Sequence, residues 1–242
     1  MYRMFSLGEI MKFIDIFTHK TTKKILMAIT AACIIVASIV TKQHFIRVMP
    51  LFVSIFVMIY QTEARRSAFL IGGLNAVLYA FIYFFYFKLY GNAFTALFVS
   101  FPLQIATVIN WKKHAYKKTT YFKRMSTRMR IWLSLGSAVV FLALFVILTA
   151  LGSPYAILDN ASSIIGTIIT IIVLFAYIEY AYLMPIHTAL ALMLQVQLYM
   201  NDPTGLPYLI MAIFNFYCGI NIFITVRRIY RQQQAELAES AE

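Results

Sequence analysis

The placement of positive charge constrains this chain more than any other feature of its sequence. Residues 112–130 hold eight Lys or Arg and no acid, and they separate two long runs that carry no charge. Shorter basic segments separate further apolar runs. Because Lys and Arg accumulate in the cytoplasmic loops of membrane proteins, this pattern predicts a chain that crosses a membrane many times.

The composition argues against most soluble folds. Hydrophobic residues make up 62% of the 242 residues and charged residues 12%, against about 25% charged in a typical soluble domain. The net charge of +12 would also suit nucleic-acid binding. Since the basic residues flank apolar runs, we expect contact with anionic membrane lipid and no nucleic-acid partner. Cys33 and Cys218 lie within apolar runs and are expected to be buried thiols.

Eight segments reach or approach the roughly 20 apolar residues that a membrane-spanning helix needs. The second and the seventh are short. In chain order the segments are Ile25–Thr41, Val48–Tyr60, Ser67–Phe87, Ala93–Trp111, Ile131–Leu151, Ala161–Ile178, Pro185–Met200 and Leu206–Val226.

The chain ahead of these segments has a different pattern. Leu7–His19 has apolar residues at helical spacing with its charges on other faces, which predicts a helix on the membrane surface. We therefore divide the chain into a cytoplasmic amphipathic segment (1–24), a transmembrane domain (25–228) and a cytoplasmic tail (229–242).

The loops agree with eight crossings. With the N-terminus in the cytoplasm, 18 of the 21 Lys and Arg fall on the cytoplasmic side, and only Lys42, Arg47 and Lys88 fall outside. One missed crossing would invert every later loop, so this bias supports eight spans with both termini in the cytoplasm.

The fourth and eighth segments share a polar pattern. Gln104 precedes Asn110 by six residues, and Asn215 precedes Asn221 by the same interval. The segment before each of them carries a polar residue near its start. Two parallel three-helix repeats joined by a single helix would explain this pattern, as in SWEET carriers. The predicted fold is an all-α membrane protein of 3+1+3 architecture after an extra N-terminal helix, with repeats at about 46–111 and 161–226 and a linker helix at 131–151.

None of the eight segments holds a charge near its centre. Asp159 lies at the outer start of the sixth and Glu179 at its inner end, where a solvated position is the simpler interpretation. Ion-coupled pumps normally need a buried relay of such groups, so we expect passive transport, with proton coupling through Glu179 as the alternative. P-loop, HExxH and CxxC patterns are absent. We predict no catalytic residue, metal site or cofactor; a membrane enzyme and a lipid-binding structural protein are less favoured alternatives.

In place of central charges, the eight segments contain neutral hydrogen-bonding side chains. An amide without a partner costs several kcal/mol in hydrocarbon, so each must face protein or a water-filled cavity. One amide serves helix packing as readily as binding, but amides in two matching sets of helices favour a central polar site lined with aromatic rings. Asn110 lies about 120° from Gln104 on its helix, so packing is the alternative for it. The candidate substrate-binding residues are Asn75, Tyr79, Gln104, Asn110, Trp111, Tyr180, His187, Gln195, Asn215 and Asn221.

The chain resembles the PnuC family of vitamin transporters, whose best-known substrate is nicotinamide riboside, over roughly residues 45–230. The resemblance rests on the helix order and on five stretches, which are Leu74-Asn75-Ala76-Val77-Leu78-Tyr79, Leu89-Tyr90-Gly91-Asn92, Leu103-Gln104 with Asn110-Trp111, Tyr177-Ile178-Glu179-Tyr180, and Gly219 with Asn221 and Phe223. It implies facilitated diffusion of a nucleoside-like molecule, trapping by phosphorylation inside the cell, a homotrimer and a bacterial plasma-membrane location.

The chain departs from the family at several aromatic positions. Family members that carry nicotinamide riboside have a W-x-x-W pair after the Tyr-Ile-Glu stretch, where this chain has Ala181 and Met184. His114 and Phe223 replace the last Trp of the fourth and eighth helices. Losing the pair removes stacking surface for a charged pyridinium ring. Nicotinamide riboside and (deoxy)nucleosides therefore stay equally open as substrates, and thiamine or another vitamin is a further alternative.

Overall fold

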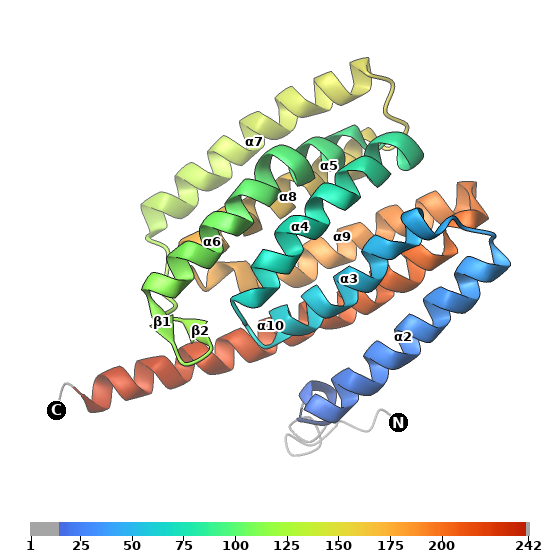
Figure 1. The fold of residues 1–242 in the computed structure, drawn as a ribbon. Helices are drawn as coiled ribbons and strands as arrows, with labels where there is room; N and C mark the ends of the chain where they lie inside the picture. Colours follow the sequence, from blue (N-terminus) through green and yellow to red (C-terminus); the bar gives the residue numbers. More distant parts are fainter. Residues whose placement is uncertain (1–14, 241–242) are drawn as a thin grey trace, which may run out of the picture.

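The computed structural model describes residues 15–240. Within that range eight helical segments are long and apolar enough to cross a membrane, which confirms the predicted number. They run side by side in one bundle (Figure 1). The surface helix predicted at Leu7–His19 falls mostly outside the described residues. In chain order the elements are α2 (Lys20–Val40), α3 (Phe45–Thr62), α4 (Ser67–Ile82), η1 (Tyr83–Phe87), α5 (Tyr90–Phe94), η2 (Thr95–Ser100), α6 (Phe101–Lys113), β1 (Ala115–Tyr116), β2 (Thr119–Thr120), α7 (Thr127–Ala150), α8 (Ala156–Leu174), α9 (Glu179–Asn201), η3 (Pro203–Gly205) and α10 (Leu206–Glu239).

The helices are longer than several of the apolar runs that predict them. The short second and seventh segments become the full-length helices α3 and α9, because residues beyond the apolar runs, among them Arg47, Gln61 and Glu179, continue the helix. The sixth span, predicted at Ala161–Ile178, is displaced: α8 begins five residues earlier, at Ala156, and ends at Leu174. Ala176 then adopts a left-handed conformation with φ 57°, which turns the chain out of the helix.

The residues predicted as a separate tail, 229–242, continue α10 as far as Glu239. Gln233 on this extension is 1% exposed. Its side-chain amide accepts from the Phe122 backbone N–H (3.0 Å) and donates to the Thr120 carbonyl (2.9 Å). The basic segment, residues 112–130, is therefore docked on α10. Its backbone also contacts the α8–α9 loop, where the Lys123 N–H donates to the Ala176 carbonyl (3.0 Å).

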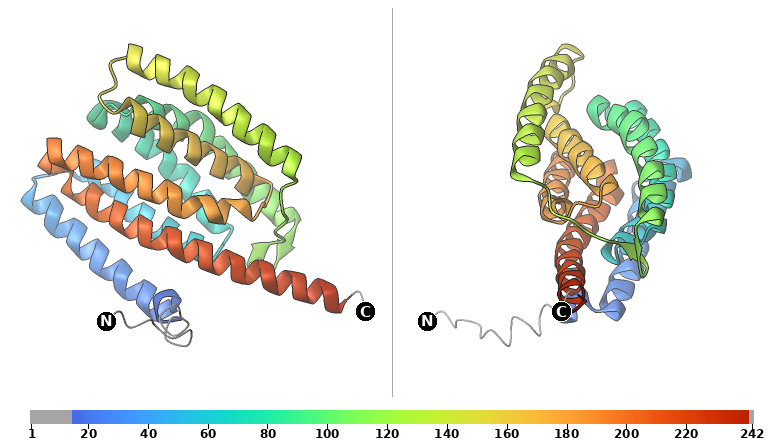
Figure 2. Two further views of the ribbon diagram at one scale, coloured as in Figure 1. Left: turned by 180° about the vertical axis from the view of Figure 1, so that it is seen from behind. Right: turned by 90° about the vertical axis from the view of Figure 1, so that its left-hand side faces the viewer.

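Two helices lie at the edge of the bundle. α7 runs along one side of it, packs mainly on α8 and buries only Leu148 (Figure 2). α2 packs on α10 and α3 at another edge. Cys33 on α2 is exposed, contrary to the sequence expectation, because that face of α2 has no neighbouring helix; Cys218 on α10 is buried as expected.

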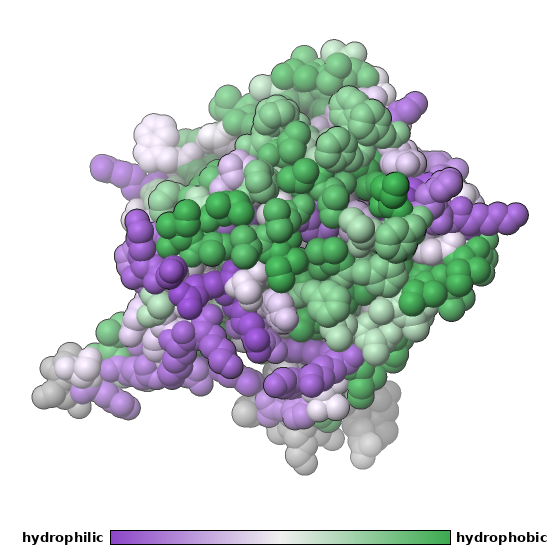
Figure 3. Space-filling model, in the orientation of Figure 1, coloured by the Kyte–Doolittle hydropathy of each residue, from purple (hydrophilic) through white to green (hydrophobic). Residues whose placement is uncertain are grey.

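The surface has the polarity of a membrane protein. An apolar belt covers the middle of the bundle, and hydrophilic residues gather toward its two ends (Figure 3). One end, called here the basic end, carries residues 112–126, the α8–α9 loop and the C-terminus of α10. The opposite end carries the α2–α3, α7–α8 and α9–α10 connections. A chain with eight apolar helices and this belt is a membrane protein.

Candidate functional site

A cavity of about 280 Å³ lies at the centre of the bundle. Its walls come from α3, α4, η1, α5, η2 and α6 on one side and from α8, α9 and α10 on the other. Among the described residues, neither α2 nor α7 contributes a side chain to this lining, and no Lys, Arg, Asp or Glu does. The central cavity therefore lies between the two groups of spans and is walled by uncharged side chains.

Five of the predicted site residues line the central cavity. They are Asn75, Tyr79, Gln104, His187 and Asn215. Four of them bring a buried polar atom that has no protein partner among the described residues: Asn75 Oδ1, Gln104 Oε1, His187 Nδ1 and Asn215 Oδ1. Because an unsatisfied buried polar atom costs about 1–3 kcal/mol, this cluster is suited to a polar ligand or water.

Contacts between α3 and α4 orient the Asn75 side chain in the cavity wall. The Asn75 amide nitrogen donates to Ser54 Oγ (2.8 Å) and to the Pro50 carbonyl (3.2 Å), so both of its protons are used in the wall. Ser54 in turn donates to the Tyr79 hydroxyl (3.0 Å). With its amide nitrogen held this way, Asn75 keeps its oxygen free.

Two glycines make room for polar side chains of the cavity. A Cβ on Gly72 would lie 2.4 Å from Gln104 Oε1, so only glycine lets that amide rest against α4. A Cβ on Gly166 would lie 3.2 Å from His187 Cε1, inside ordinary contact distance. Gln104 and His187 can therefore take these positions only because the facing helix has a glycine, which lacks a Cβ, at the point of contact.

The other predicted residues lie elsewhere. Asn110 donates to the Leu174 carbonyl (2.7 Å), and Trp111, fully buried, donates to the Val173 carbonyl (2.8 Å). Both tie α6 to the last turn of α8, where the Val173 carbonyl also accepts from the Ala176 N–H (2.9 Å). Asn221 donates to Tyr217 of its own helix (3.2 Å). Gln195 is half-buried on α9, and neither it nor Asn221, Asn110 or Trp111 lines the central cavity.

Tyr180 lies between the central cavity and the basic end. It lines a smaller cavity of about 60 Å³ that shares Gln104 and other wall residues with the central one. Beyond it, aromatic rings pack in sequence: Tyr180 on Phe122 (6.0 Å between centroids), Phe122 on Trp111 (5.7 Å), and Trp111 on Phe69 (4.7 Å). These four rings form one aromatic cluster between the smaller cavity and the basic end, and Phe122 of the docked basic segment is one of them.

The two acidic residues singled out in the sequence are both bonded outside the central cavity. The Asp159 carboxylate accepts from the backbone N–H groups of Gly91 and Asn92 (3.0 Å each) and from the Asn92 side chain, which joins α8 to the start of α5. Glu179 pairs with Arg130 (2.6 Å) and accepts from the Met125 N–H (3.1 Å), so it is not a solvated helix end.

Sequence reasoning missed the small hydroxyl residues of the lining. On α8, Ser162, Gly166 and Thr170 recur every four residues and form one polar or small stripe along the helix. That spacing was readable in the sequence. Ser54, Thr95 and Thr188 have no comparable signal, since hydroxyls also bond to their own helix, as Thr188 does with the Met184 carbonyl (2.9 Å).

Comparisons with known proteins show which protein family this chain is similar to. The model of a family described as nicotinamide mononucleotide transporter matches residues 44–227. A curated protein from Neisseria mucosa, nicotinamide riboside transporter PnuC, is 24% identical over 189 residues, covering 75% of this chain and 72% of that protein. A crystal structure of the vitamin B3 transporter PnuC matches with a TM-score of 0.73 and 20% sequence identity, over 87% of this chain and 90% of that chain. At this identity the structural match establishes the fold.

Proposed function

Because the chain belongs to the nicotinamide mononucleotide transporter family, we propose that it carries a nucleoside-like small molecule across a membrane by facilitated diffusion. The binding site is the central cavity. The four buried polar atoms that lack protein partners there, on Asn75, Gln104, His187 and Asn215, are the observation that carries the proposal. The hydroxyls and the carboxamide or base edge of a nucleoside supply matching hydrogen bonds.

The absence of charge in the lining selects between a nucleoside and its phosphate ester. Phosphate groups are bound in proteins by Arg, Lys, metal ions or helix N-termini. Among the described residues that line the central cavity there is no Lys or Arg. We therefore expect the unphosphorylated nucleoside to bind and the mononucleotide to be rejected, since a desolvated phosphate without a partner is very costly.

Two kinds of ligand are candidates for the central cavity. Nicotinamide riboside is favoured by the family, whose similar member from Neisseria mucosa is named for that molecule. Neutral nucleosides and deoxynucleosides are favoured by Ala181 and Met184, which offer no aromatic face to a cationic ring. Thiamine and other vitamins complete the panel to be screened.

The positions of the two acidic residues support the proposal of passive transport. Asp159 and Glu179 both have protein partners and neither lines the central cavity, so within residues 15–240 no carboxylate relay faces this cavity. Phosphorylation in the cytoplasm then drives net uptake, because the charged product cannot return through an uncharged cavity. Replacement Glu179→Gln tests the alternative, since proton-coupled transport would lose its response to a pH gradient and a uniporter has none.

The arrangement of the lining also supports two parallel repeats. In this proposal residues of about 46–111 and 161–226 form the repeats, 131–151 is the linker helix, and the protein acts as a homotrimer in a bacterial plasma membrane with both termini in the cytoplasm. Light scattering of the purified protein tests the trimer, and labelling of single cysteines introduced near each terminus tests the orientation.

The decisive experiment is a binding and uptake screen. Purified protein is heated with nicotinamide riboside, nucleosides, deoxynucleosides, thiamine and nicotinamide mononucleotide, and hits are tested for saturable uptake into liposomes. A ligand at about 100 times its Kd adds roughly 2.7 kcal/mol of stability, which a thermal shift detects. Tight binding of the mononucleotide but not of its nucleoside would overturn the proposed site. Recovery of chemically altered ligand would indicate an enzyme.

A further inference from the structure

A second cavity, of about 610 Å³, opens beside α7 at the basic end. It is lined by α7, by the ends of α8 and α9, and by the basic segment that precedes α7. It shares no lining residue with the central cavity. We call it the α7 groove. Its volume lies in the range of small-molecule sites, about 300–1,000 Å³.

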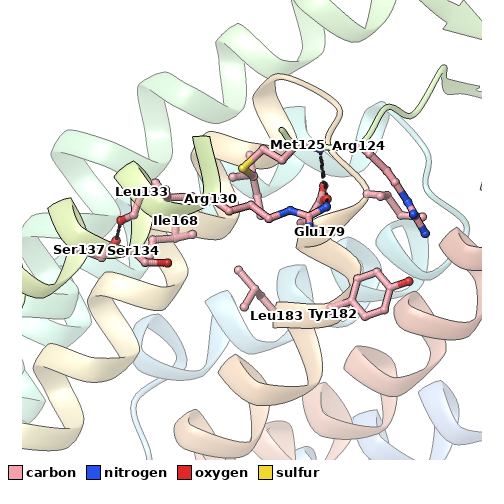
Figure 4. A pocket seen from close by; sticks show the side chains of 12 residues that line it. Arg124, Met125, Arg130, Leu133, Ser134, Ser137, Ile168, Glu179, Tyr182 and Leu183 are labelled. Carbon is pink, nitrogen blue, oxygen red and sulfur yellow. Dashed lines mark hydrogen bonds and ion pairs between the residues drawn. The ribbon is translucent and has the colours of Figure 1, made fainter. Parts of the chain in front are cut away.

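The α7 groove is polar at one end and apolar along its length. Arg124, Arg130 and Glu179 lie at the level where α7 and α9 begin (Figure 4). Farther along the helices the walls are Leu133, Ile168, Ile172 and Leu183, with Ser134 and Ser137 on α7. Seven residues separate Arg130 from Ser137 on α7, which is about 10 Å of depth at 1.5 Å per residue.

The charge at the polar end is positive and only partly balanced. Arg130 pairs with Glu179 (2.6 Å), and half of its side chain stays exposed (50%). Within residues 15–240 no ion pair involves Arg124, and its guanidinium lies over the face of the Tyr230 ring (5.8 Å). The groove lining thus holds two guanidinium groups and one carboxylate at this end, which leaves a net positive charge for a further anion, and guanidinium favours phosphate oxygens.

We propose that the α7 groove binds one anionic phospholipid from the cytoplasmic leaflet. Its phosphate lies between Arg124 and Arg130, and an acyl chain lies along Leu133, Ile168 and Leu183. The groove lies among helices that cross the bilayer, and its polar end is at the end of the bundle where basic residues collect, which is where lipid head groups lie. A lipid in the groove also covers part of α7, which buries only Leu148 against the rest of the bundle.

Native mass spectrometry of the purified full-length protein tests this site, with equal amounts of phosphatidylglycerol and phosphatidylcholine added. The wild type is expected to retain phosphatidylglycerol preferentially. A basic residue near the membrane surface contributes about 1 kcal/mol to anionic-lipid binding, so Arg124→Gln and Arg130→Gln should each lower retention about fivefold. Arg128→Gln is the matched control, because Arg128 lies in the same basic segment but does not line the groove.

Two further arms keep the test decisive. Arg124→Gln leaves the Arg130–Glu179 pair intact, so it remains informative if Arg130→Gln misfolds. Ser134→Trp fills the groove without changing charge and should lower retention of both lipids. Excess inorganic phosphate should not displace the lipid, because the acyl chain contributes to binding. Equal retention of the two lipids by the wild type, equal losses in Arg128→Gln and Arg124→Gln, or displacement by inorganic phosphate would each overturn the proposal.

Discussion

Two amides six residues apart on one helix serve different purposes in this protein. Gln104 brings a buried, unpartnered oxygen to the central cavity, whereas Asn110 donates to a carbonyl at the end of α8. The second group of spans differs in part: Asn215 lines the cavity, whereas Asn221 lies outside it and donates to its own helix, although its Oδ1 is also buried without a partner. Six residues along an α-helix place two side chains about 120° apart around its axis, so the two amides of a pair cannot face the same neighbour.

We expect this difference to separate effects on ligand binding from effects on stability. A polar atom without a protein partner costs stability in the empty protein and is available to a ligand. A polar atom bonded across two helices stabilises the bundle and offers nothing to a ligand. Substitutions in the two sets should therefore change different measurements.

The largest effect is expected from the cavity amides. The double variant Gln104→Leu with Asn215→Leu removes two hydrogen-bonding groups from the proposed site, at about 1–3 kcal/mol for each ligand group left unpaired. Uptake into liposomes should fall about 100-fold. The matched variant Asn110→Leu should keep uptake within about threefold of the wild type per folded protein. Equal losses of uptake in the two variants would contradict the assignment.

Gly72 offers a test that leaves every polar group in place. In Gly72→Ala the new methyl group would lie 2.4 Å from Gln104 Oε1 and must displace that amide. We expect uptake to fall about tenfold, as the loss of one well-placed hydrogen bond does. Gly73→Ala is the control, because its nearest contact would be an ordinary 3.5 Å. If the two variants transport equally, the position of Gln104 does not matter for binding.

The tie between α6 and α8 should affect stability. Asn110→Leu and Trp111→Phe each remove the donor to a carbonyl in the last turn of α8. Each loss should cost about 1–2 kcal/mol, or a fall in Tm of roughly 2–8 °C at this chain length. Thermal unfolding in detergent measures it. Ligand affinity per folded molecule should stay unchanged, and a selective loss of affinity would move these residues into the site.

The smallest effect on stability is expected from a hydrogen-bonded carboxylate outside the membrane-spanning helices. Asp202, between α9 and η3, accepts from Thr204 Oγ1 (2.8 Å) and the Thr204 N–H (3.0 Å), which holds the pKa of its carboxyl below the usual 3.8. The folded pKa is depressed, so this stabilisation is present above pH 3.8 and is lost as pH falls through the folded pKa. Thermal unfolding between pH 6 and about 3 should show a slightly steeper fall for the wild type than for Asp202→Asn. A reversed order would contradict the assignment.

The sequence determined the membrane character and the number of spans. Apolar runs separated by basic loops leave few alternatives, because every backbone polar group in a bilayer must bond within a helix. The helical angle between Gln104 and Asn110 indicated packing as an alternative role for Asn110, which stayed among the predicted binding residues, since helix geometry is local. The family resemblance of Leu74-Asn75 and Leu103-Gln104 was likewise readable from the residues.

Only the tertiary structure decided which polar groups meet. Trp111 shares a helix face with Gln104 within about 20°, yet it lies seven residues farther along and packs on α8, where the basic segment brings Phe122 against it. The partnership of Glu179 with Arg130 and the docking of residues 120–122 on Gln233 join segments that are far apart in the chain. Such contacts depend on how the helices pack against one another, and hydropathy along the sequence carries no information about that packing.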